Sequence, residues 1–521
     1  MVSCSQFNLS SLPNLLEDAA AERPDAVFLD DRRRTLTYAQ TQAEVRSLAS
    51  FLRRNGLNPG DRVAIQMRNR VEVAIAVFAT AAVGGVFVVL NDKLRPKGVE
   101  KIFRQAEPRV LIGDAEVTEP ASGNGIDIRV QTGADAATAR EGWIGWEQAV
   151  ADPDTLPERP PASGNATVCL VFTSGSTADP RGVELSHANI RFVVAAIQAR
   201  LNYRPEDVVG CFLPLAFDYG LYQIFLAAQA GARLFIGDPD QVGPRLPRIL
   251  AEAGVSVLPG VPAVYAALLM LGKRRPIALP ALRAVTNTGE RLPRAYIDGL
   301  KAMFSGLEVY VMYGLTECKR VSILLPEECE CRPDSVGRPL DGTEVYAADE
   351  LGRRLPPGIA GELVVRGPHV AKGYWRAPEE TARRYRVTGV NGGRQVDLFT
   401  GDRGRVDDEG FLYFAARADD LLKHRGNRIS PVEIENEACG IGGVSEAAAL
   451  KRVADDTLHL FISTDDADLS QNAILSALSK VLEPAKIPDF VHPRPSLPKS
   501  INGKTDRKSL QRQLESETTA S

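Results

Sequence analysis

A run of hydroxyl-bearing residues follows an apolar segment in the first half of the chain. Residues 166–172 (ATVCLVF) predict a buried strand, directly followed by Thr173, Ser174, Gly175, Ser176 and Thr177. Hydroxyls and backbone N–H groups of such a loop can bind a polyphosphate, and Arg181 adds a charge suited to phosphate. The alternative is a polar surface turn. The loop is not a P-loop, because Pro180 stands where that motif requires glycine.

A second candidate segment is 312–319 (MYGLTECK), which follows another predicted strand. Ligands of open α/β sheets collect at the carboxyl ends of strands. There, Tyr313 can stack on a base, Thr316 can donate to a phosphate, and Glu317 offers the hard oxygens that Mg²⁺ prefers. The alternative is an ordinary turn with a solvated glutamate.

Three further positions allow both a chemical and a structural interpretation. Asp402, in the segment LFTGD, can accept from ribose hydroxyls or can cap its own turn. His187 begins a predicted helix capped by Ser186, where a packing role is favoured over a general base. Lys504 lies in a basic segment near the C-terminus, where lysines are ordinarily solvated.

Composition excludes several classes of protein. The 521 residues are 44% hydrophobic and 25% charged, with a net charge of −4, which argues against a nucleic-acid-binding protein. The seven cysteines have no zinc-ligand spacing and favour a reducing, cytoplasmic compartment. The first residues do not resemble a signal peptide. Residues 73–90 are uncharged, but Gly84 and Gly85 divide them into a buried helix and a strand, so no membrane span is expected.

The order of elements predicts an α/β fold with several domains. Strands and helices alternate over 35–112 and again over 208–321, which is typical of parallel sheets covered on both faces. Residues 352–401 predict a small β-rich unit, and a final compact unit begins near residue 419. Ser10 and Ser11 are expected to cap a first helix, and Ser430 with Glu433 predicts a capping box.

The chain resembles the adenylate-forming superfamily of acyl-CoA synthetases, peptide-synthetase adenylation domains and luciferases. The hydroxyl-rich loop resembles its T-S-G-[ST]-T-G-x-P-K-G-V signature, with Ala178 and Arg181 as departures. YGLTE matches Y-G-x-T-E, and TGD is also present. Residues 414–435 and 497–508 resemble the hinge and the terminal lysine segment.

This resemblance implies two domains, an N-terminal adenylation core of residues 1–417 and a small mobile α+β C-terminal domain of residues 418–521. The core would contain two parallel-sheet α/β subdomains and the β-rich unit, and Asp419 would be the hinge. Lys504, Glu317 and Thr316 would be catalytic, with Glu317 holding Mg²⁺ through ATP. The implied ATP-binding residues are Thr173, Ser174, Gly175, Ser176, Thr177, Arg181, Gly289, Glu290, Tyr313, Gly314, Asp402 and Arg417. The implied substrate-binding residues are Asp218, Phe217, Asn287 and Leu315.

The implied activity is ATP-dependent adenylation of an amino acid or another carboxylic acid. The acyl group would then pass to the phosphopantetheine thiol of CoA or of a separate carrier protein. A medium- or long-chain fatty acid or aryl acid CoA ligase is the alternative. A luciferase-like or non-catalytic nucleotide-binding relative is the second alternative. Asp218 could pair with a substrate ammonium, as in amino-acid-activating relatives, or could cap a turn.

The hinge assignment yields a first testable prediction. Asp419→Pro should leave acyl-adenylate formation nearly unchanged and slow thioester formation, because it restricts the backbone about which the C-terminal domain would rotate. Pyrophosphate exchange and single-turnover thiol acylation measure the two steps separately. Equal losses in both steps would contradict a hinge at this position.

Overall fold

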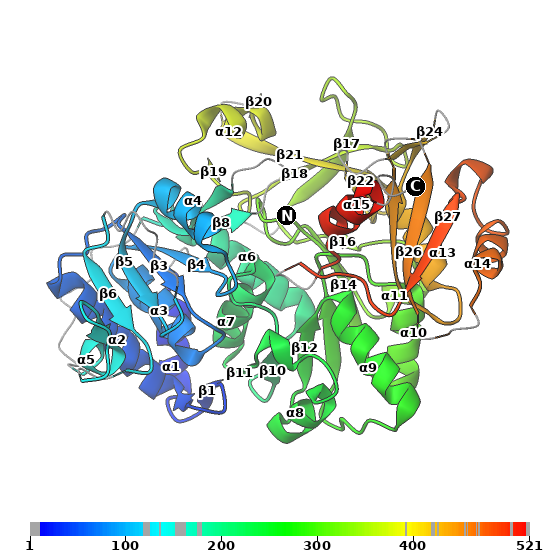
Figure 1. Cartoon of the computed structure of the whole chain (residues 1–521). Helices are drawn as coiled ribbons and strands as arrows, with labels where there is room; N and C mark the ends of the chain where they lie inside the picture. The colour runs from blue at the N-terminus through cyan, green and yellow to red at the C-terminus, as the bar shows by residue number, and fades with distance from the viewer. Residues whose placement is uncertain are drawn as a thin grey trace.

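The computed structural model describes residues 11–117, 125–134, 137–151, 163–173, 180–390, 393–417, 422–424, 427–452, 455, 457–464, 466, 469–500 and 504–516. Two large, mainly parallel sheets, one antiparallel sheet and a smaller C-terminal α+β unit make up the molecule (Figure 1). The α/β fold expected from the sequence is therefore confirmed.

The first large sheet has eight strands in the order β19-β9-β8-β4-β3-β5-β6-β7. Its central strands are parallel, whereas β9 pairs antiparallel with both β8 and β19. Its strands are β3 (Arg62–Gln66), β4 (Val86–Leu90), β5 (Pro108–Gly113), β6 (Ile128–Gln131), β7 (Ile144–Gly145), β8 (Thr167–Thr173), β9 (Arg181–Ser186) and β19 (Gly373–Tyr374). α2 (Tyr38–Arg54) precedes β3, and the helices that follow among these strands are α3 (Val71–Ala82), α4 (Pro96–Ala106) and α5 (Trp146–Ala149).

The second large sheet has nine strands in the order β16-β15-β14-β13-β12-β10-β11-β1-β2. The strands from β14 to β1 are parallel. Its strands are β1 (Val27–Asp30), β2 (Thr35–Thr37), β10 (Val208–Cys211), β11 (Arg233–Ile236), β12 (Val257–Gly260), β13 (Ala284–Asn287), β14 (Glu308–Tyr313), β15 (Ser322–Leu324) and β16 (Arg338–Pro339). Its helices are α1 (Asn14–Glu22), α6 (His187–Leu201), α7 (Asp218–Ala230), α8 (Leu246–Ala253), α9 (Pro262–Arg274), α10 (Arg294–Met303) and α11 (Glu328–Cys331), with a 3₁₀ turn at Pro239–Gln241.

The remaining elements form the β-rich unit and the C-terminal unit. The antiparallel sheet contains β17 (Glu344–Ala348), β18 (Gly361–Arg366), β20 (Tyr385–Val390), β21 (Gly393–Val406) and β22 (Leu412–Arg417), and α12 (Pro378–Arg384) precedes β20. The C-terminal unit contains β23 (Leu422–His424), β24 (Asn427–Ile429), α13 (Pro431–Cys439), β25 (Val444–Lys451), β26 (Leu458–Thr464), α14 (Gln471–Leu478), a 3₁₀ turn at Pro484–Lys486, β27 (Phe490–Arg494) and α15 (Arg507–Ser516).

The buried cores follow this division. The largest apolar cluster joins both parallel sheets and reaches into the β-rich unit, from Leu12 to Leu412. Two other clusters lie wholly between residues 429 and 514, and one of them packs α15 against β25 and β26 through Leu510 and Leu514. The domain boundary at 417/418 remains a prediction, because residues 418–421 lie outside the described residues.

Capping explains some helix starts and corrects others. Ser186 and Asn189 form a capping box at α6, as expected, and His187 Nδ1 accepts a hydrogen bond from the Leu12 N–H, a packing role. The expected caps at α1 and α13 were wrong where they can be checked. Pro13 is the N-cap of α1, and the Ser430 hydroxyl donates to the Ala415 carbonyl instead of capping α13. A nearby strand carbonyl is thus the competing acceptor at Ser430.

The apolar stretch 73–90 forms most of α3 and all of β4, with nearly every side chain of α3 buried. Among the described residues, no helix combines the length and the apolar character needed to cross a bilayer.

Tyr38, the first residue of α2, packs against β1 of the second large sheet and contacts α7. Its ring stacks on Phe28, with centroids 4.5 Å apart, and its buried hydroxyl lies 2.7 Å from the carbonyl oxygen of Ala232 and 3.1 Å from that of Ala227. Tyr38→Phe should therefore lower the free energy of unfolding by about 1–2 kcal/mol, because buried carbonyls lose their donor.

Urea denaturation followed by circular dichroism measures this change. Tyr385→Phe is the matched control, because the buried Tyr385 hydroxyl has no hydrogen-bond partner among the described residues. Equal stability of the Tyr38 and Tyr385 variants would contradict the prediction.

Candidate active site

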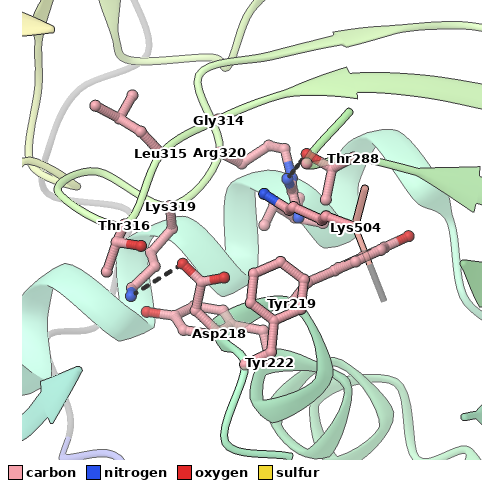
Figure 2. A pocket seen from close by; sticks show the side chains of 13 residues that line it. Asp218, Tyr219, Tyr222, Thr288, Gly314, Leu315, Thr316, Lys319, Arg320 and Lys504 are labelled. Carbon is pink, nitrogen blue, oxygen red and sulfur yellow. Dashed lines mark hydrogen bonds and ion pairs between the residues drawn. The ribbon is translucent and has the colours of Figure 1, made fainter. Parts of the chain in front are cut away.

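A pocket of about 460 Å³, partly open to solvent, lies where β13 and β14 end and α7 begins. Parallel strands of one sheet deliver their carboxyl ends to the same edge, which is where ligands bind in such folds. Figure 2 shows how side chains from these segments converge on the pocket. The lining residues predicted from the sequence are Phe217, Asp218, Gly289, Gly314, Leu315, Thr316 and Lys504. The others are Ile197, Tyr219, Tyr222, Thr288, Lys319 and Arg320.

The loop between β14 and β15 is folded tightly back on itself. The Val321 N–H donates to the Tyr313 carbonyl at 2.9 Å, and the Lys319 N–H donates to the Leu315 carbonyl at 2.6 Å. A Cβ on Gly314 would lie only 1.9 Å from the Lys319 carbonyl oxygen, so this position requires glycine. Lys319 itself has φ of +64°, a left-handed conformation that costs roughly 1–2 kcal/mol for a residue with a side chain.

This loop directs two cations into the pocket. The Lys319 Nζ lies 3.5 Å from Asp218 Oδ2 and 5.5 Å from the centroid of the Tyr222 ring. The Arg320 Nη1 donates to Thr288 Oγ1 at 2.6 Å (Figure 2). Burial lowers the pKa of Arg320. The left-handed turn at Lys319 thus places two adjacent cationic side chains in the pocket.

Asp218 occupies the first turn of α7. Phe217 is the N-cap residue, without a side-chain cap, and the Asp218 carboxylate faces Lys319 across the pocket. A carboxylate in the first turn is stabilised by the helix dipole. The structural alternative is that Asp218 caps a turn. The N-cap residue of α7 is Phe217, so Asp218 is not the helix cap.

Lys504 reaches the pocket from the C-terminal unit. The Ser500 N–H donates to the Lys504 carbonyl and the Asp506 N–H donates to the Pro498 carbonyl, each at 2.7 Å, so residues 498–500 pair with residues 504–506. The Lys504 Nζ lies 5.4 Å from the centroid of the Phe217 ring. Gly289, whose φ of +90° favours glycine, lies against this side chain, and a Cβ there would be 3.1 Å from Lys504 Cε, a tight contact. Next to it, Glu290 Oε1 accepts from the Thr505 N–H, and burial raises the pKa of Glu290 against the opposing charge of Lys504.

A second group of predicted residues forms its own hydrogen-bonded cluster. The Tyr313 hydroxyl donates to Asp402 Oδ2 at 2.6 Å, and Arg417 Nε lies 3.4 Å from Asp402 Oδ1. The Tyr313 ring packs against Phe414, with centroids 5.6 Å apart. Burial raises the pKa of Asp402, and the Tyr313 hydrogen bond and Arg417 oppose that shift. Both Asp402 oxygens therefore already have partners in this structure.

Glu317 is the predicted magnesium ligand. Its Oε1 accepts from the Tyr374 hydroxyl at 2.6 Å and lies 3.6 Å from Arg384 Nη1. Among the described residues, no cluster of three metal-ligating side chains occurs. Mg²⁺ in nucleotide enzymes is commonly held by one or two carboxylates together with phosphate oxygens, so a single glutamate fits that kind of site.

The remaining predicted residues lie apart from this pocket or outside the described residues. Arg181 pairs with Glu380 at 2.7 Å and lies over the Tyr374 ring. Asn287 is buried and is not among the residues that line the pocket, and neither of its side-chain polar atoms has a hydrogen-bond partner among the described residues. Ser174, Gly175, Ser176, Thr177 and Asp419 lie outside the described residues, as does the side chain of Thr173.

Sequence reasoning missed Lys319, Arg320, Thr288, Tyr374 and Arg384. Lys319 is the last residue of the segment 312–319 and Arg320 follows it, and two adjacent cations before an apolar strand are a usable signal. Tyr374 and Arg384 lie more than 50 residues after Glu317. No local pattern connects them to it.

Comparison with known proteins identifies the family. A family model described as AMP-binding enzyme matches residues 16–375. The chain is 30% identical to 4-coumarate–CoA ligase 2 of Oryza sativa, covering 95% of this chain and 91% of that one. It is 28% identical to enterobactin synthase component F of Escherichia coli over 96% of its own length, but it spans only 39% of that relative.

Solved structures agree with this result. The anthranilate CoA ligase AuaEII, in complex with anthranoyl-AMP, matches with a TM-score of 0.90 and 25% identity, and the alignment covers 100% of both chains. VinN in complex with L-aspartate matches with a TM-score of 0.67 and 32% identity, covering 78% of this chain and 98% of that one.

The close approach at Gly314 gives a testable prediction. Gly314→Ala should displace the 314–320 loop and lower both the rate of adenylation and the free energy of unfolding, the latter by about 1–3 kcal/mol, since the new Cβ meets backbone atoms. Gly442→Ala is the control, because a Cβ there meets nothing within 4 Å. Thermal melts and pyrophosphate exchange measure the two effects. Wild-type behaviour of the Gly314 variant would contradict the geometry.

Proposed function

The chain belongs to the AMP-binding enzyme family of AMP-forming acid ligases, and on this premise we propose that it adenylates a small polar carboxylic acid and passes the acyl group to a thiol. The observation that carries the proposal is the position of Lys504. This lysine comes from the C-terminal unit and lies in one pocket with Thr316 and Asp218. Such an arrangement can bind the two negatively charged reactants of an adenylation, the carboxylate and ATP, next to each other.

In the first step, an oxygen of the substrate carboxylate would attack the α-phosphorus of ATP. The bond from this phosphorus to the bridging oxygen breaks, and pyrophosphate leaves with that electron pair. Both reactants are anions, so fixed positive charge and correct positioning account for most of the acceleration. Lys504 would face the reacting groups. Thr316 would donate a hydrogen bond to a phosphate oxygen, and Tyr313, Asp402 and Arg417 would form the nucleoside side of the site.

The residues at Glu317 fit a magnesium ion bound together with ATP. A bound Mg²⁺ would neutralise phosphate charge. Tyr374 orients the Glu317 carboxylate through its hydroxyl, and Arg384 supplies a further positive charge beside it. These contacts fix Glu317 before any ligand arrives, which lowers the cost of ordering it.

The character of the pocket supports a small polar acid over a fatty acid. Asp218, Lys319 and Arg320 line it, and an alkyl chain would cover these charges while offering the two cations no further acceptor. Asp218 could pair with a substrate ammonium, and the complex of VinN with L-aspartate supports an amino-bearing acid. An aryl acid is the second candidate, supported by the rings of Phe217, Tyr219 and Tyr222 and by the likeness to 4-coumarate–CoA ligase 2.

In the second step, a thiolate would attack the carbonyl carbon of the acyl-adenylate, and AMP would leave. The acceptor class is a phosphopantetheine thiol, on CoA or on a carrier protein. The CoA ligases among the relatives support the first, and the synthetases that extend well beyond the length of this chain support the second. A cytoplasmic location and a separate carrier partner stay part of this proposal.

The test concerns Lys504. Lys504→Ala should lower pyrophosphate exchange with an accepted acid on the order of a hundred- to a thousandfold, as is typical when an aimed charge is removed from such a site. Lys508→Ala is the matched control, because Lys508 is exposed on α15 in the same segment. Circular dichroism should show both variants folded. Exchange by Lys504→Ala close to that of Lys508→Ala would overturn the proposal.

A further inference from the structure

The pocket contains more positive than negative charge. Three of its lining residues are cations, Lys319, Arg320 and Lys504, and one is a carboxylate, Asp218. Lys504 is accounted for by the proposed adenylation step, so Lys319 and Arg320 share a single carboxylate. Two cations are expensive to bury unless each is paired.

Lys319 is placed in the pocket without a hydrogen-bond acceptor. Its side chain is only 4% exposed, and its Nζ lies 3.5 Å from the nearer Asp218 oxygen, beyond a normal hydrogen bond. The ammonium carries three N–H donors, and Nζ has no hydrogen-bond partner among the described residues. The Tyr222 ring on its other side attracts the charge but accepts no conventional hydrogen bond.

Arg320 also has an N–H donor without a hydrogen-bond acceptor among the described residues. It is 7% exposed, and its guanidinium lies 5.2 Å from the centroid of the Tyr219 ring. Its Nη1 donates to Thr288 Oγ1, a neutral acceptor, and its Nε has no hydrogen-bond partner among the described residues. Figure 2 shows Arg320 on the Thr288 side of the pocket and Lys319 on the Asp218 side, both reaching inward from the same loop.

If Lys319 and Arg320 only stabilised the fold, each of their buried N–H donors would be expected to have a hydrogen-bond acceptor. A lysine that only stabilised the fold would be expected to bind Asp218 directly and to fill its remaining donors with carbonyl oxygens. Instead the chain adopts a left-handed backbone at Lys319, and Gly314 is needed to permit it. Backbone strain that delivers an unsatisfied cation to a pocket is typical of ligand sites.

We propose that Lys319 and Arg320 bind a second negatively charged group of the substrate, a carboxylate additional to the one that is adenylated. This inference rests on the proposed acid adenylation and narrows its substrate class to small dicarboxylic acids, with or without an amino group. Lys319 binds the second carboxylate as a point charge, and Arg320 contributes a planar donor set. Asp218 then holds the Lys319 ammonium toward the substrate.

The experiment compares acids with amides of the same size. L-Aspartate is paired with L-asparagine, and succinate with succinamate, so that each pair differs in one negative charge. The rate of pyrophosphate exchange gives kcat/KM for each compound. In the wild-type protein at least one dicarboxylate should be preferred over its amide by about ten- to a hundredfold, the range expected for hydrogen bonds to a charged group.

Lys319→Met removes the charge and keeps the length of the side chain. It should reduce the acid-to-amide preference to within about threefold of unity, mainly by raising KM for the dicarboxylate. Lys319→Arg should retain a preference, which shows that charge is the cause even if the loop shifts. Lys273→Met is the control, because Lys273 is exposed in the last turn of α9, and its preference should match the wild type.

Two results would overturn the inference. One is equal use of acid and amide by the wild type, or exchange only with monocarboxylic acids such as L-alanine or butyrate. The other is an unchanged acid-to-amide ratio in Lys319→Met. In either case the proposed adenylation would stand. Failure of every acid to support exchange would overturn the proposed function as well, and so the two failures are distinguishable.

Discussion

The loop after β14 can fold back on itself only because Gly314 has no side chain. The Lys319 carbonyl occupies the space that a Cβ would need, and the chain returns to pair with Tyr313 at Val321. Within this short loop, Thr316 and the two cations line the pocket and Glu317 stands beside Tyr374 and Arg384. One steric constraint thus determines the positions of Thr316, Glu317, Lys319 and Arg320 together.

The electrostatics of the pocket follow from this constraint. The cations are almost wholly buried beside the rings of Tyr219 and Tyr222, where charges interact more strongly than at the surface. Asp218 offsets part of the charge and is itself held at the first turn of α7. The protein therefore presents a positive site built before ligand arrives, which is the arrangement that favours anionic reactants.

The reach of Lys504 depends on a second, separate unit. α15 packs on β25 and β26 through Leu510 and Leu514, and Arg507 pairs with both oxygens of the partly buried Glu435 at 2.6 Å. These contacts anchor the segment behind Lys504, while Gly289 leaves room for its side chain on the core. The unit that carries Lys504 thus has its own apolar core, separate from the largest cluster of the molecule.

The sequence alone determined the elements and the family. Alternating strands and helices predicted parallel sheets, because burial on both faces demands long apolar runs, and the motifs at Tyr313, Asp402 and Lys504 indicated nucleotide chemistry. Local patterns also misled, as at Ser430, whose hydroxyl binds a strand carbonyl distant in sequence. Only the tertiary structure shows what surrounds Lys319, Arg320 and Tyr374. What a charged side chain can bind depends on the carboxylates and rings around it. Those neighbours come from segments up to about 100 residues away in the chain, as Asp218 does for Lys319.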